Sequence, residues 1–234
     1  MAGDNYYYLT ALTPPADLGA PLPITQAELL SMIRDNADAA EMVAALFLGD
    51  DLVQMQAMAS GELETPVPAV LSPAQVSGEM PLPDSLEPSG QTSPRRIASD
   101  AVWEAYYRHL GAVAEKHDSR FLKDWVGFEV ALRNALVSAR AAGLGIEPSD
   151  YTVAVDLADP HADVDDIVKD WSAASDPLAG LRVLDRGRWQ WLHENDQAYA
   201  FTNDELVAYA AKLMLAARWL RLTEAEDDAQ GPAA

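Results

Sequence analysis

Apolar residues recur at steps of three and four along most of the chain, which is the spacing of helices that bury one face. The clearest run predicts one long helix that begins at Asp118 or Ser119 and ends near Ala142, before Gly143 and Gly145. Its apolar positions form a wide stripe: Phe121, Leu122, Trp125, Phe128, Leu132, Leu136 and Val137. A stripe of this width predicts a helix packed against several neighbours.

Weaker helical patterns occupy the rest of the second half. Ser99 is expected to cap a helix whose buried positions are Val102, Trp103, Tyr106, Leu110 and Val113. Residues 163–174 form another, with acids in the first turn, where the helix dipole favours them. Asp176 and Pro177 begin a third, which we expect to be interrupted near Gly187. A capping box at Thr202 begins a final helix that ends near Leu222.

The first sixty residues predict three shorter helices. Thr25 and Glu28 form a capping box, in which each side chain satisfies the other's free amide, and the helix ends near Asn36. A second helix runs over residues 38–48, with Gly49 as its stop, and a third covers residues 51–59.

Two short segments favour extended structure. The N-terminal run of residues 5–9 holds Tyr6, Tyr7 and Tyr8 and is aromatic and β-prone. Residues 151–155, Tyr-Thr-Val-Ala-Val, have the composition of a short strand, although no partner strand is evident.

Proline marks the organisation of the chain. Seven of the 15 prolines lie between Glu62 and Arg96, in a stretch that also collects Ser and Gly and predicts a linker. Such a stretch is either a mobile arm or wraps a surface. The sequence therefore predicts a mainly α protein, a helical bundle with a short extended N-terminal segment and a long Pro-rich linker. Its parts are residues 1–61 (small, helical), 62–98 (linker), 99–223 (main helical domain) and 224–234 (acidic tail).

Charge narrows the range of partners. The 234 residues hold 37 acids against 16 bases, a net charge of −21 at pH 7. This balance argues against nucleic-acid binding and against direct docking on an anionic lipid surface, and leaves basic protein partners open. There is no cysteine, no basic secretory leader and no apolar run of the roughly 20 residues that cross a bilayer, so we expect a cytoplasmic protein without direct membrane insertion.

Catalytic signatures are absent from the sequence. It holds no phosphate-binding glycine loop and no G-x-S-x-G elbow, and its four histidines are scattered, so we expect them at the surface. The acidic run from Asp156 to Asp166 includes His161 and could hold a hard cation, but acids before a helix are also what ordinary capping produces. Capping is the favoured interpretation. We therefore predict no cofactor, no metal and no enzymatic activity.

Charged and aromatic residues suggest structural or interface roles. Glu129 and Arg133 are four apart on the long helix, either as an exposed pair or as a partly buried ion pair at a packing seam, with Asn134 beside it. Trp189 and Trp191, with Arg186 and Arg188, form the most basic and aromatic patch, a composition that interfaces favour, although a core role for one tryptophan is expected. Arg218 and Arg221, in the last turns of the final helix, suit its dipole and need no partner.

Three stretches resemble a bacterial family of unknown function that is encoded with V/A-type ATPases. The first is the N-terminal run that contains Tyr6, Tyr7 and Tyr8. The second, residues 121–134, places Trp125, Phe128, Glu129, Arg133 and Asn134 on one helix. The third, residues 209–220, contains Arg218 and Trp219.

The resemblance implies that the protein stands in for the C subunit of a V/A-type ATPase, which is known as d in eukaryotes. That protein is a non-catalytic helical adaptor between the central stalk and the membrane rotor ring. The implied partners are these ATPase components, and the implied location is the cytoplasm, peripherally associated with the membrane through the complex. The alternatives are a helical protein-interaction or assembly factor, or a metal-dependent hydrolase built on residues 156–166.

Overall fold

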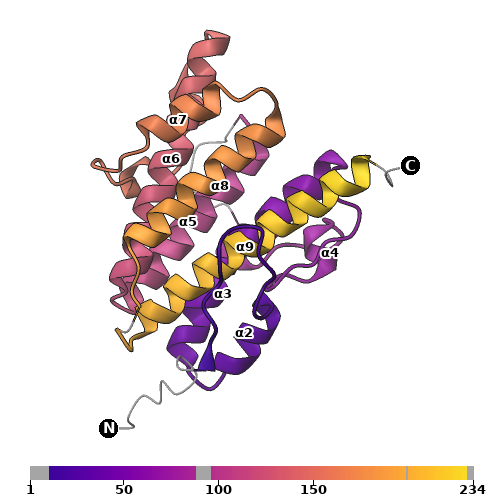
Figure 1. Cartoon of the computed structure of the whole chain (residues 1–234). Helices are drawn as coiled ribbons and strands as arrows, with labels where there is room; N and C mark the ends of the chain where they lie inside the picture. The colour runs from indigo at the N-terminus through magenta and orange to yellow at the C-terminus, as the bar shows by residue number, and fades with distance from the viewer. Residues whose placement is uncertain (1–10, 88–95, 199, 231–234) are drawn as a thin grey trace.

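The computed structural model describes residues 11–87, 96–198 and 200–230, and within these the chain is helical, without a strand (Figure 1). The mainly α fold predicted from the periodicity is therefore confirmed. Tyr6, Tyr7, Tyr8 and the predicted extended segment lie outside the described residues. The elements are α2 (Gln26–Ile33), α3 (Ala37–Ser60), α4 (Pro73–Val76), η1 (Asp84–Leu86), α5 (Ala98–Lys116), α6 (Arg120–Leu144), η2 (Pro148–Asp150), η3 (Val155–Leu157), α7 (Asp165–Ser172), α8 (Pro177–Glu194) and α9 (Asn203–Gln230).

Helix α9 crosses the middle of the bundle. It packs against α3 and α2 on one side and against α6 and α8 on the other, and α3 also contacts α5 (Figure 1). Helices from both halves of the sequence thus contribute to one apolar core, in which Leu46, Leu122 and Leu213 are fully buried. Helix α3 is buried on most of its circumference, from Ala39 to Gln54.

Several helix ends follow their predicted chemistry. Thr25 and Glu28 form the expected capping box at α2, with the Glu28 amide donating to Thr25 Oγ1 at 3.1 Å. Ser119 caps α6, Gly145 ends it with a φ of +67°, and Asp176 caps α8 before Pro177. At α9 only half of the predicted capping box forms: the Thr202 hydroxyl accepts from the Glu205 amide at 3.4 Å, but the Glu205 carboxylate accepts from the amide of Phe201.

Two glycines do not break helices as predicted. Helix α3 runs without interruption through Gly49, and α8 runs without interruption through Gly187. A Cβ at Gly49 would lie 2.5 Å from the hydroxyl of Tyr106 on α5, and a Cβ at Gly187 would lie 2.6 Å from Ile167 Cδ1 on α7. Each glycine therefore allows a neighbouring side chain to approach the helix closely.

The strand predicted for residues 151–155 is wrong, and the reason lies in a side chain. The Asn134 amide donates to the Val153 carbonyl at 2.9 Å and accepts from the Val153 amide at 3.0 Å. An asparagine on α6 thus supplies the hydrogen bonds that a neighbouring strand would supply, while Val153 is fully buried.

Smaller corrections concern helix ends. Helix α5 begins at Ala98 with Ile97 in the cap position, so Ser99 is not the cap. Helix α7 is shorter than residues 163–174, and α9 ends at Gln230 rather than near Leu222, so the helix extends into the predicted acidic tail.

The described part of the proline-rich stretch wraps a surface. The Asp51 carboxylate on α3 accepts hydrogen bonds from the backbone amides of Ala69, Val70 and Leu71 at 2.8, 2.9 and 2.7 Å. Gln54, one turn further along α3, pairs with the backbone of Val67. Residues 62–87 therefore form a strap, which two polar side chains of α3 hold through its backbone. The buried side chains of Leu71, Val76 and Leu86 also anchor the strap; α4, which contains Val76, contacts α3, and η1, which contains Leu86, contacts α5.

Candidate functional site

A buried ion pair joins α6 to α8. Arg188 Nε donates to Glu129 Oε1 at 2.6 Å and Arg188 Nη2 donates to Glu129 Oε2 at 3.1 Å. The two side chains are only 14% and 12% exposed, so the pair is held away from bulk water. The bidentate geometry fixes the relative orientation of the two helices as well as their distance.

Asp185 extends this pair to the final helix. Its side chain is fully buried and lies 3.4 Å from Arg188 Nη1 and 3.5 Å from Arg218 Nε on α9. We call Glu129, Asp185, Arg188 and Arg218 the charge network. It contains two acids and two bases from three helices, so its formal charges balance.

Tyrosines on α5 border the charge network. Burial raises the pKa of both Tyr106 and Tyr107, and the negative charge of Glu129 adds to the effect. Burial opposes the charged form of Arg188, but the neighbouring Glu129 outweighs it, so the pKa of that guanidinium is raised. Both phenols are therefore neutral at physiological pH, and the Tyr106 hydroxyl donates to the Leu46 carbonyl at 3.3 Å.

Aromatic side chains pack beside the charge network. Trp191 stacks on Phe128 with a centroid distance of 5.2 Å and meets Trp125 edge-on at 5.3 Å. The structure thus places Trp125, Phe128 and Trp191 in the packing between α6 and α8, while Trp189 is half-buried against His193.

The predicted pair of Glu129 and Arg133 is wrong, because each side chain has another partner. Arg133 Nη2 donates to Asp100 on α5 at 3.0 Å, and its guanidinium lies 4.9 Å from the centroid of the Trp103 ring. Asn134, which we expected beside an ion pair, instead holds the loop at Val153.

The final helix also differs from expectation. Arg218 and Arg221 were expected to need no partner, but Arg218 binds Asp185 and Arg221 binds the buried Asp50 on α3. Trp219 lies between them in sequence and is half-buried beneath two arginines of α8. The three side chains together join α9 to α3 and α8.

One histidine expected at the surface is buried. The side chain of His117 is 8% exposed, and its Nε2 lies 2.9 Å from Glu41 on α3. Lys116 Nζ donates to the same carboxylate at 2.7 Å. These hydrogen bonds lower the pKa of Glu41, the one from Lys116 most strongly.

The acidic run from Asp156 to Asp166 does not converge on a cation site in the described part of the chain. Within those residues no group of three or more His, Asp or Glu side chains is arranged to hold a metal ion. Asp156 binds Arg108 through two hydrogen bonds of 3.1 and 3.0 Å, and Asp159 accepts from the His161 amide at 2.9 Å. These contacts tie the loop to α5 and to itself.

Sequence reasoning found Glu129, Arg188 and Arg218 individually but missed the acids that complete their contacts. Asp50, Asp100 and Asp185 are all nearly fully buried. Asp185 directly follows Leu184 in an apolar stripe, and an acid at such a position could have pointed to burial. Asp50 lies between Gly49 and Asp51, and Asp100 lies in the first turn of α5, where an acid is ordinary, so neither carried this signal.

The chain is thus a mainly helical protein whose conspicuous charged residues bind one another across helix interfaces. No protein family, no curated protein and no solved structure matches it. Among the helices of the described residues, none is both long and apolar enough to cross a membrane.

Proposed function

We propose that the protein is a non-catalytic component of a V/A-type rotary ATPase, an adaptor that couples the central stalk to the membrane rotor ring as the C subunit does. One observation carries the proposal. Two of the three stretches that resemble the ATPase-associated family contribute Glu129 and Arg218, and these side chains are joined through Arg188 and Asp185. The residues behind the resemblance therefore build the framework of the body.

A framework of this kind suits a mechanical role. A body that transmits torque must resist shear between its helices, and a bidentate ion pair resists sliding because its hydrogen bonds are directional. The charge network links α6, α8 and α9, and the contact of Arg221 with Asp50 links α9 to α3. Force applied at one helix would thus be distributed over the bundle.

The net charge supports a protein partner of opposite sign. With an excess of 21 acids, the chain would be steered toward basic patches on the stalk or on the cytoplasmic face of the ring. Steering of this kind weakens as salt screens the charges, so association rates with such a partner should fall with ionic strength.

Co-purification tests the proposal. The full chain, tagged in its native host, is recovered from membranes solubilised in a mild detergent, and the associated proteins are identified by mass spectrometry. We expect the ATP-driven head, the central stalk and the ring to be recovered in fixed proportion to the tagged chain. An unrelated acidic protein with the same tag controls for adhesion through charge.

Two outcomes would contradict the proposal. Recovery only with incomplete assemblies, and never with complex that hydrolyses ATP, would make the protein an assembly factor. Recovery with none of the ATPase components would overturn the proposal.

A further inference from the structure

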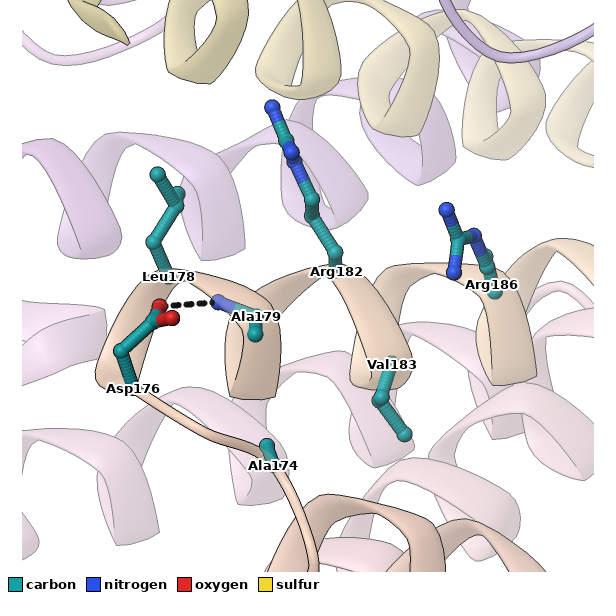
Figure 2. Close-up of a pocket in the computed structure, with 7 residues that line it drawn as sticks. All are labelled: Ala174, Asp176, Leu178, Ala179, Arg182, Val183 and Arg186. Carbon is teal, nitrogen blue, oxygen red and sulfur yellow. Dashed lines mark hydrogen bonds between the residues drawn. The ribbon is translucent and has the colours of Figure 1, made fainter.

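One face of α8 presents arginines to the surface. Arg182 and Arg186 are one turn apart, and their guanidinium carbons lie 5.9 and 5.6 Å from the centroid of the Trp219 ring on α9. Figure 2 shows both side chains rising from α8 on the same side, toward α9. We call Arg182, Arg186 and Trp219 the Arg–Trp face.

A shallow hollow of about 300 Å³ adjoins these arginines (Figure 2). It is lined by Ala174, Asp176, Leu178, Ala179, Arg182, Val183 and Arg186. The one acid in this lining is engaged by the chain itself, because Asp176 accepts from the Ala179 amide and from the Ser175 hydroxyl, both at 2.8 Å. The hollow therefore combines aliphatic side chains with the positive charge of Arg186.

The arginines of α8 differ in what they contact. Arg188 is buried in the charge network, whereas Arg186 is exposed and has no ion pair to any residue in the described ranges. Its contact with the Trp219 ring restrains the guanidinium without neutralising it. A restrained arginine loses less conformational entropy when a partner binds than a free one does.

We infer that the Arg–Trp face and its hollow dock an acidic segment of a protein partner. The guanidinium fork of Arg186 matches a carboxylate, and Leu178 and Val183 of the hollow offer apolar area beside it, the mixture typical of protein interfaces. The net charge of −21 opposes the approach of an acidic segment to the rest of the chain, so its binding depends on the local contact with Arg186. The inference does not depend on the partner belonging to a rotary ATPase.

A zero-length cross-link tests the contact directly. Arg186→Lys keeps the positive charge and introduces an amine, which a carbodiimide couples to a carboxylate in contact with it. In the assembly purified through a tag on the full chain, we expect the introduced amine to be joined to an Asp or Glu of the partner. Wild-type chain, which has no amine at this position, should give no such product. Coupling only to acids of the same chain, or recovery of the chain without a partner, would overturn the inference.

A pair of charge reversals gives the second measurement. Arg186→Glu and Lys123→Glu each change the net charge by the same amount, and Lys123 is an exposed residue on α6. We expect Arg186→Glu to weaken partner binding at least tenfold and Lys123→Glu to leave it unchanged, because only the first removes a local contact. Equal effects would show that net charge alone controls binding and would refute the docking face. A cross-linked partner outside the ATPase would support this inference while refuting the proposed function.

Discussion

At the scale of single residues, Arg188 neutralises two buried acids, Glu129 and Asp185. Arg188→Met would leave both carboxylates with less compensation in a site that excludes water. We expect the free energy of unfolding, measured by urea denaturation, to fall by about 3–5 kcal/mol. Adding Glu129→Gln to this variant should recover part of the loss, because it removes one of the buried charges.

The matched control is a pair of the same chemistry at the surface. Arg120 lies 3.5 Å from Asp124 and its side chain is 91% exposed. Arg120→Met should cost less than about 0.5 kcal/mol, since water screens this pair. A similar loss for both methionine variants would contradict a special role for the charge network.

The contact between Glu41, Lys116 and His117 predicts sensitivity to acid. A carboxyl group whose pKa is lower in the folded than in the unfolded chain stabilises the fold above its ordinary pKa, and this stabilisation is lost as pH falls through the folded value. Stability should therefore decline below about pH 4.5, and Glu41→Gln should flatten that part of the curve. Glu115→Gln, on the exposed side of α5, serves as the control in thermal melts between about pH 3 and pH 6.

The residues of the charge network were easier to predict than the contacts between them. Glu129 and Arg188 stood out because charges beside apolar and aromatic residues are unusual. Their pairing could not be predicted, since the two lie 59 positions apart and helical spacing relates only residues three or four apart. The local rule instead suggested Arg133 as the partner of Glu129.

At the scale of elements, two glycines in helices should respond to alanine in opposite directions. Gly49→Ala places a Cβ 2.5 Å from the Tyr106 hydroxyl and should destabilise the protein by about 1–3 kcal/mol. Gly143→Ala, in α6, meets nothing within 4 Å and should stabilise it by about 0.5–1 kcal/mol through helix propensity. Urea denaturation checks both, and a stabilising Gly49→Ala would refute the close approach of Tyr106.

The Asp51 carboxylate holds one segment of the strap, residues 69–71. Asp51→Ala removes the acceptor of three backbone amides, and we expect a loss of about 3 kcal/mol. Amide hydrogen exchange at residues 69–71 should become at least about tenfold faster, because these donors gain access to water. Glu79→Ala, at an exposed position of the same strap, should leave the exchange of these amides unchanged.

Helices with a long run of apolar residues at helical spacing were predictable. Segments whose structure depends on contacts with residues distant in the sequence were not. Helix α6 has an N-cap residue, a stripe and a C-terminal glycine, all of them local signals. The loop at Val153 has strand-like composition, but its hydrogen bonds come from Asn134, 19 residues earlier. Gly49 and Gly187 predicted breaks in α3 and α8, because glycine has a low helix propensity. The sequence does not reveal that the side chains of Tyr106 and Ile167 pack closely against these two glycines.

At the scale of the whole molecule, an excess of 21 acids makes the folded chain repel itself. Raising NaCl from about 10 mM to about 1 M shortens the Debye length from about 30 to about 3 Å. We expect Tm to rise over this range, because screening weakens the repulsion while the buried pairs are screened much less. An uncharged osmolyte at matched osmolality is the control, and a falling Tm would mean that exposed ion pairs outweigh the repulsion.

The mainly helical class was predictable at this scale, because periodicity recurs along the chain. The packing partners of the helices were not. The apolar residues of α3 and α9 show that each helix must pack against other elements. They do not show that the two helices pack against each other, since hydrophobic contact is not directional.

The contact between α3 and α9 has a consequence for synthesis on the ribosome. Helix α9, which shields α3 and supplies Arg221 to Asp50, is translated more than 140 residues after it. At elongation rates of about 5–20 residues per second, this leaves an interval of about 7–30 s in which α3 lacks its main cover. The nascent chain is therefore a candidate client for ribosome-associated chaperones, and the core is completed only after α9 has been synthesised.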